Sequence, residues 1–226
     1  MRLELTEDLD ETLGGLFDGS GRTPFDALHN GYHLPLLGAG LKHYAFKNFF
    51  EEALKSELRG TCIGMELLEV IRKKPVRLVF GDLGSMKAIA AHQGDQVIIQ
   101  ERFFVAVAAA LGYSPESLLE DSDKVSELAK LYAPIFVHEL IHHRQTLDTE
   151  RKVFLAEGVL PYNQDWEVEA FLGQDAFLSE KLRSNPAYAA LAERLSSAKP
   201  TLGKSLGLRG GGSLEELRAT LLTRGY

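Results

Sequence analysis

The residues with the clearest chemical potential in this chain form one short pattern, His138-Glu139-Leu140-Ile141-His142, which is H-E-x-x-H. Apolar residues surround the pattern and predict a buried helix, on which residues four apart lie one turn above each other. Both imidazoles then leave the same face and can bind one metal ion. Glu139 lies beside that face, where its carboxylate can accept a proton from a metal-bound water.

Zinc is the ion that these residue types favour. Two neutral imidazoles and a carboxylate leave a fourth position for water, whose pKa falls to about 7 on the metal. A cysteine cage is excluded, because Cys62 is the only cysteine among the 226 residues. The single cysteine also excludes an intramolecular disulfide and is compatible with a reducing compartment.

The elements that must position the pattern are predicted to be mostly helical. Hydrophobic periodicity, helix caps and breakers predict helices over residues 41–58, 62–72, 103–111, 115–119, 124–132, 165–183 and 186–198. Pro134 is expected to open a separate helix that carries the H-E-x-x-H pattern, since proline is tolerated in a first turn but interrupts a helix interior. A loop is expected over 149–163, with Asp165 as the N-cap of the helix that follows.

Three short apolar runs between the helices predict strands at 76–80, 86–91 and 96–100, separated by turns at Gly81-Asp82 and Gly94-Asp95. The expected fold class is therefore α+β, mostly helical, with a small, partly antiparallel three-stranded sheet beside the H-E-x-x-H helix. We expect three regions: residues 1–60, an N-terminal loop and helical region; residues 61–198, the metal-binding core; and residues 199–226. The last region is predicted to be a glycine-rich linker over 199–213 followed by a helix over 214–222.

On these residues the chain resembles the zincin metallopeptidases, and specifically the gluzincins, in which a glutamate on a later helix completes H-E-x-x-H. The resemblance covers residues 76–182 and includes the order of the elements. It implies peptide-bond hydrolysis, in which zinc polarises the scissile carbonyl while Glu139 takes a proton from water and passes it to the leaving amine. It also implies that the last strand, residues 96–100, is a sheet edge on which an extended peptide pairs.

The resemblance suggests Glu169 as the third zinc ligand beside His138 and His142, because Glu-Ala followed by an aromatic residue recurs on the ligand helix of small gluzincin-like families. Glu167 is the main alternative, and the two cannot both serve because they point to different sides of a helix. The remaining alternatives are Glu150, Glu157 and Asp148. For the oxyanion of an acyl-transfer reaction, four donors stay open: Tyr162, Tyr132, His92 and His143.

Charge and composition limit the partners. With 25 Lys and Arg against 32 Asp and Glu, the net charge of −7 gives no basic footprint for a nucleic acid. No apolar run reaches the roughly 18 to 20 residues of a membrane span, and the acidic start lacks the apolar core of a secretory signal, so we expect no membrane partner and a cytoplasmic protein. The expected partner is a peptide or protein substrate. The alternative function is a non-catalytic module that zinc stabilises, or a degenerate peptidase-like scaffold that binds a partner.

Overall fold

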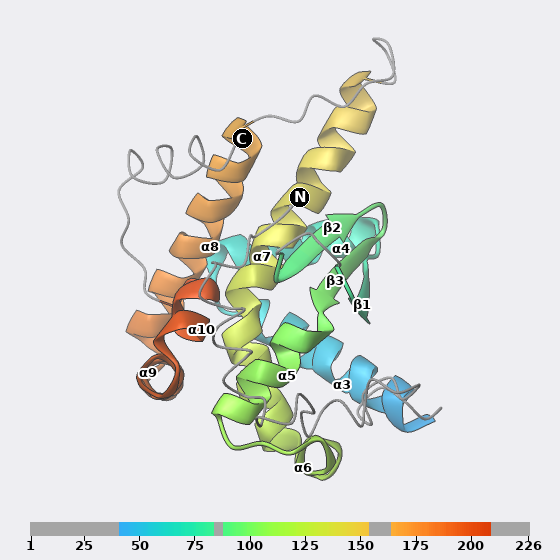
Figure 1. The fold of residues 1–226 in the computed structure, drawn as a ribbon. Coiled ribbons are helices and arrows are strands. Elements are labelled where there is room, and N and C mark those ends of the chain that lie inside the picture. The colour runs from blue at the N-terminus through green and yellow to red at the C-terminus, as the bar shows by residue number, and fades with distance from the viewer. Residues whose placement is uncertain (1–40, 84–87, 154–163, 209–226) are drawn as a thin grey trace.

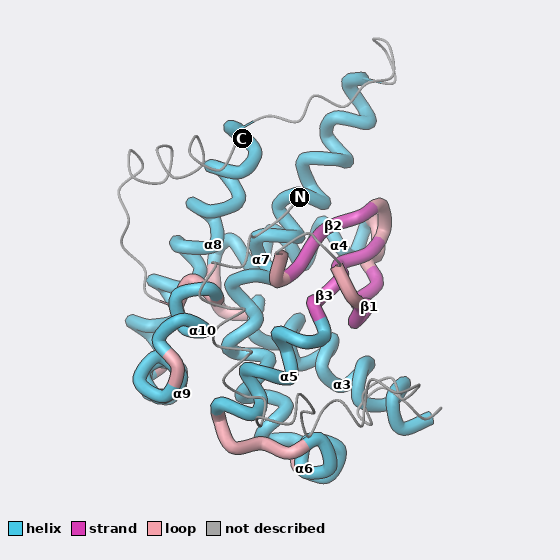
Figure 2. Tube along the Cα trace, in the orientation of Figure 1, coloured by secondary structure: helices cyan, strands magenta, loops and turns pink. Residues whose placement is uncertain are grey.

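The structure is a computed structural model that describes residues 41–83, 88–153 and 164–208. Its helices are α3 (Leu41–Leu58), α4 (Cys62–Lys73), α5 (Glu101–Ala110), α6 (Pro115–Glu120), α7 (Ser122–Val153), α8 (Gln164–Ser184), α9 (Pro186–Ala198) and α10 (Pro200–Ser205). Its strands are β1 (Arg77–Gly81), β2 (Ala90–Gln93) and β3 (Gln96–Gln100). The predicted α+β class, mostly helical with one small sheet, is confirmed (Figure 2). Within the described ranges, no helix is both long and apolar enough to cross a membrane.

Helix α7 runs through the middle of the molecule, between the sheet on one side and α8 on the other (Figure 1). The expectation that Pro134 opens a new helix is wrong, because α7 continues through this residue. Proline has no N–H, so the carbonyl of Lys130, four residues earlier, lacks its helical donor. The hydroxyl of the buried Tyr188, on α9, donates to that carbonyl at 2.6 Å. A tertiary hydrogen bond thus replaces the missing helical one and lets the helix continue.

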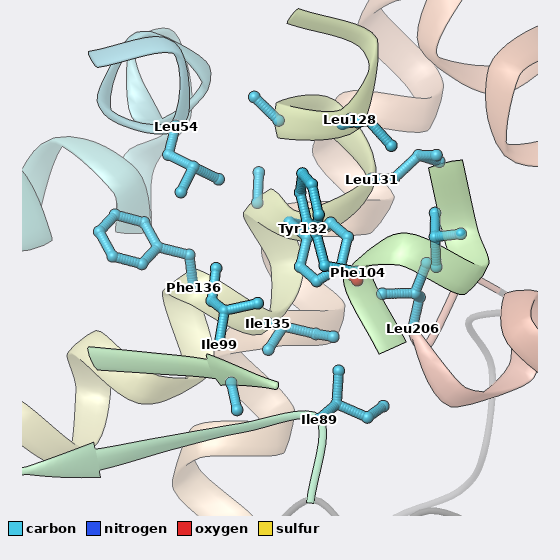
Figure 3. Close-up of a cluster of buried hydrophobic side chains, with 14 of the residues drawn as sticks. Leu54, Ile89, Ile99, Phe104, Leu128, Leu131, Tyr132, Ile135, Phe136 and Leu206 are labelled. Carbon is cyan, nitrogen blue, oxygen red and sulfur yellow. The ribbon is translucent and has the colours of Figure 1, made fainter. Parts of the chain in front are cut away.

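The hydrophobic core forms around the N-terminal half of α7. Side chains from α3, β3, α5 and the end of α10 converge on this half, as Figure 3 shows for Leu54, Ile99, Phe104, Leu128, Leu131, Tyr132, Ile135, Phe136 and Leu206. One continuous cluster of buried residues extends from Phe46 to Leu208. Helix α3, from the predicted N-terminal region, and the segment after α9 therefore share a core with residues 61–198.

The segment predicted as a linker, residues 199–213, is packed structure in its first part. Residues Pro200–Ser205 form α10, and Leu202, Leu206 and Leu208 are buried. Its glycines misled the prediction, because Gly203 serves close packing rather than flexibility: a Cβ there would lie 2.5 Å from the Ser196 hydroxyl oxygen of α9. The helix predicted over 214–222 lies outside the described residues.

Two boundaries near the expected 149–163 loop also differ. Helix α7 continues to Val153, so residues 149–153 are helical, and residues 154–163 are not described. Helix α8 begins at Gln164, which places Asp165 inside its first turn rather than at the N-cap. The next helix start is as predicted, because the Asn185 side chain caps α9 by accepting a hydrogen bond from the Tyr188 backbone N–H at 3.1 Å.

The sheet has the strand order β1-β3-β2, with β3 parallel to β1 and antiparallel to β2. The partly antiparallel sheet is thus confirmed, but the expectation that residues 96–100 form its edge is wrong. A two-residue turn at Gly94-Asp95, with Gly94 at φ +60°, folds β2 back along β3, while β1 occupies the other side of β3. The edges are β1 and β2, and β2 is the edge strand that packs on α7.

The hydrogen bond across Pro134 can be tested with two buried tyrosines. Tyr188→Phe leaves the Lys130 carbonyl without a donor, and we expect it to lower the free energy of unfolding by about 1–3 kcal/mol, measured by urea denaturation. Tyr132→Phe is the matched control, because the Tyr132 hydroxyl is buried without a hydrogen-bond partner among the described residues. We expect that variant to be as stable as wild type or more so. Equal losses in the two variants would contradict the role of Tyr188.

Candidate metal centre

The structure brings His138 and His142 of α7 together with Glu167 of α8. The two Nε2 atoms lie 3.2 Å apart, and His138 Nε2 lies 3.7 Å from Glu167 Oε2. One ligand atom from each of the three side chains falls within 4.8 Å of the others. Two ligands about 2.1 Å from a tetrahedral ion lie roughly 3.4 Å apart, so these separations suit one small cation. This buried group could hold a metal ion.

Close packing of α7 and α8 produces this arrangement. Gly173 of α8 faces Ile141 of α7, and a Cβ at Gly173 would lie 2.3 Å from Ile141 Cδ1. Ile141 immediately precedes His142. Gly173 therefore leaves room for a buried side chain next to a metal ligand, and an added Cβ would displace the end of Ile141.

The predicted ligand Glu169 points away from the histidines. Its side chain is 50% exposed, accepts a hydrogen bond from Arg144 at 2.6 Å, and accepts another from the Gln145 amide at 2.7 Å. Residues two apart on a helix differ by about 200° in direction, so Glu167 faces the cluster when Glu169 faces out. The structure thus places the alternative, Glu167, at the histidines.

A signal for Glu167 was present in the sequence. The buried apolar positions of α8 include Ala170, Phe177 and Leu178. Extending their three- and four-residue spacing backward from Ala170 reaches 167 and not 169. The family-like Glu-Ala-aromatic pattern pointed to Glu169, but the helical phase points to Glu167. The side chains of Asp148 and Glu150 and the whole of Glu157 lie outside what the structure describes.

Each histidine of the cluster also contacts a glutamine amide. The Gln145 side chain lies beside His142, and its Nε2 donates to the Trp166 carbonyl at 3.1 Å and to Glu169 at 2.7 Å. Gln174, which no sequence motif marks, lies beside His138. Metal-binding histidines commonly hydrogen-bond such a neighbour through their second ring nitrogen, which fixes the orientation and tautomer of the ring.

Burial sets the charge state of the cluster. It lowers the pKa of His138 and of His142 to about 3, so both imidazoles are neutral at neutral pH, as metal binding requires. Burial, together with the neighbouring Glu167 carboxylate, raises the pKa of Glu139 to about 8. Neither Glu139 oxygen has a partner of full hydrogen-bond geometry among the described residues, although the nearby His92 backbone N–H favours the carboxylate form. Glu139 is thus a buried acid that a nearby cation would ionise.

His143, next to the second ligand, fastens the sheet to α7. Its Nε2 lies 3.1 Å from the Lys74 carbonyl at the end of α4, and its Nδ1 lies 3.0 Å from His92 Nε2 on β2. A carbonyl only accepts, so His143 donates from Nε2, and His92 donates to His143 Nδ1 when both rings are neutral. Both nitrogens of His143 are therefore engaged, which disfavours it as an oxyanion donor. Tyr132, another candidate, lies in the core against Phe104.

The outer edge of β2 lies beside Glu139. Gln100 N–H donates to the Ile89 carbonyl at 2.8 Å, and pairing alternates along antiparallel strands. The backbone groups of Ala90 and His92 consequently face away from β3, and the His92 N–H faces the Glu139 carboxylate. The outer edge of β2 and the candidate base therefore adjoin each other.

No protein-family model, curated protein or solved structure matches this chain. The function must therefore be inferred from the residues of the chain itself. The resemblance to zincins depends on the H-E-x-x-H pattern and on the order of the elements, and it stays a prediction.

The stability of the metal-free chain should fall in mild acid. Burial lowers the pKa of three histidines: to about 4 for His92 and to about 3 for His138 and His142. Below about pH 6.5 these histidines take up protons in the unfolded chain but stay neutral in the folded chain, so the folded chain loses stability as the pH falls. Glu139 acts oppositely, because its raised pKa makes stability fall as pH rises from about 4.5 to 8. The stability lost through the three histidines exceeds the stability gained through Glu139. The urea midpoint should therefore be lower at about pH 5 than at about pH 7. An unchanged or higher midpoint at about pH 5 would contradict these burial effects.

Two neighbouring glutamates provide a direct test of the ligand set. We expect wild type to bind about one zinc per chain by elemental analysis, His142→Ala to lose it, and Glu167→Gln to weaken it strongly. Glu169→Gln is the matched control and should keep the zinc, because the new amide oxygen can still accept from Gln145. Loss of zinc in Glu169→Gln with retention in Glu167→Gln would show that the original ligand assignment was right.

Proposed function

We propose that this protein is a zinc-dependent metallopeptidase with His138, His142 and Glu167 as the metal ligands. The observation that carries the proposal is the buried cluster of two neutral imidazoles and one carboxylate next to the buried Glu139, which has no side-chain hydrogen-bond partner among the described residues. Two histidines and a glutamate are a ligand set of catalytic zinc sites, which keep a fourth position for water or substrate. Within the described residues, the cluster includes no fourth His, Cys, Asp or Glu.

Glu139 is the proton carrier in the proposed reaction. A bound zinc ion supplies a Lewis acid for the scissile carbonyl and lowers the pKa of water. The Glu139 carboxylate accepts the proton of the attacking water and gives it to the leaving amine nitrogen. Its apolar surroundings favour the protonated form, which explains why its pKa in the metal-free chain is raised to about 8. Such a group holds the proton until the amine departs.

The outer edge of β2 is the proposed place for the substrate backbone. An extended peptide can add to an edge strand through main-chain hydrogen bonds, and the Ala90 and His92 backbone groups face away from β3. This edge adjoins Glu139, so a peptide lying there passes the candidate base. The central strand β3, originally expected to do this, has both sides occupied.

A second candidate function is a non-catalytic module that a closed zinc site stabilises. The observation that favours it is burial: His138 and Glu139 are 0% exposed and Glu167 is 1% exposed. Structural zinc sites are closed, whereas catalytic sites admit water and substrate. We also propose the cytoplasm as the compartment, because the one cysteine, Cys62, is an exposed free thiol.

Glu139→Gln separates hydrolysis from metal binding. The amide keeps the shape of the side chain but cannot accept the proton, so we expect zinc content to persist while peptide hydrolysis falls at least about 100-fold. Hydrolysis is measured with a library of fluorescence-quenched peptides, and zinc by elemental analysis. Full activity in Glu139→Gln would remove the proposed mechanism.

Cobalt substitution distinguishes the two candidate functions. A catalytic site has an open position, so the visible spectrum of the Co²⁺-loaded chain should change when azide is added. A spectrum that ignores azide, together with no cleavage of any library peptide, would favour the closed structural site instead.

A further inference from the structure

One face of α8 surrounds His138. Glu167, Phe171 and Gln174 follow each other at intervals of four and three residues and therefore share that face. The Phe171 ring meets the His138 ring nearly edge to face, with centroids 4.5 Å apart. The Gln174 side chain, 5% exposed, lies beside His138, and its buried amide oxygen has no hydrogen-bond partner of full geometry among the described residues. One face of α8 thus places three side chains against the buried imidazole.

The other end of the Gln174 amide meets the segment after α10. Gly207 has a φ of +68°, and a Cβ there would lie 2.4 Å from Gln174 Nε2. Leu206 and Leu208, on either side, are buried in the core, and α10 is packed closely on α9. Gly207 is therefore a fixed wall behind the glutamine, and it leaves just enough room for the amide group.

A buried glutamine is costly unless its polar atoms are used. The Gln174 amide oxygen is buried without a hydrogen-bond partner of full geometry among the described residues, and the amide lies beside the His138 ring. A leucine or methionine of similar size would fill the same space without this cost. The position of the amide, between a metal ligand and a close-packed glycine, is thus explained by its contact with His138.

We propose that Gln174 is a positioning residue of the metal centre and that residues 206–208 hold it in place. By accepting a hydrogen bond from His138 Nδ1, Gln174 keeps the proton on that nitrogen and directs the Nε2 lone pair toward the ion. The segment after α10 thereby acts on metal affinity without contacting the metal. This inference depends on the metal site of the proposed function, but not on peptide hydrolysis.

The test compares zinc affinity, measured on the full-length chain by competition with a chromophoric chelator. Gln174→Met preserves size and removes the acceptor, and we expect zinc binding to weaken by about 10- to 100-fold. Gln174→Glu keeps an acceptor oxygen and should bind zinc as tightly as wild type or more so. In the metal-free chain, the ¹⁵N spectrum of His138 should show the proton on Nδ1 in wild type and lose this preference in Gln174→Met.

Two glycine variants test the wall independently. Gly207→Ala places a methyl group against the Gln174 amide and should weaken zinc binding. Gly112→Ala is the matched control, because Gly112 has a similar φ of +77° with nothing within 4 Å of an added Cβ, so it introduces backbone strain alone. We expect both variants to lose similar stability in the metal-free state, and only Gly207→Ala to lose zinc affinity.

The outcomes separate this inference from the proposed function. Wild-type affinity in Gln174→Met would overturn the positioning role, and equal affinities in Gly207→Ala and Gly112→Ala would overturn the role of the wall. A wild-type chain that binds no zinc would contradict the metal site itself, and this inference with it. Zinc binding that follows the expected order, without any hydrolysis, would support the positioning role while contradicting the peptidase.

Discussion

The close contact between α7 and α8 is the constraint on which the candidate site depends. Two histidines and two glutamates are buried there almost completely, although carboxylates and imidazoles lose hydration when they are buried. Gly173 leaves room for Ile141, one position before a metal ligand. A side chain at 173 would have to displace Ile141 within this contact. The same burial keeps both imidazoles neutral and raises the pKa of Glu139 to about 8, so a bound cation is what would ionise Glu139.

Helix α7 carries both histidines and the candidate base, and the other elements fix its position. Helix α3 and the sheet pack on it, and His143 joins it to the end of α4 and to His92 of β2. These contacts set the edge of the sheet beside Glu139. The relative position of a peptide on that edge and of Glu139 on the helix is thus fixed by these contacts. In the proposed function, substrate alignment therefore depends on residues that take no part in the reaction.

Much of this arrangement could be predicted from sequence, since helical spacing, caps and the Gly94-Asp95 turn are local signals. The two histidines of H-E-x-x-H lie side by side as predicted, because residues four apart lie on the same face of any helix. The errors arose where tertiary contacts override local rules. Pro134 stays within a helix because of a distant tyrosine, and β3 is central because β1 reaches its far side. Gln174 was missed because no local pattern marks a residue whose partner is on another helix.

The bond between Tyr188 and the Lys130 carbonyl joins the helix that carries the histidines to the C-terminal part of the chain. Its two residues are 58 positions apart, so the helical hydrogen bonding of α7 at Pro134 is completed by a side chain of α9. His138 lies one turn beyond Pro134. A change in the packing of α9 would therefore act on α7 within one turn of the first metal ligand.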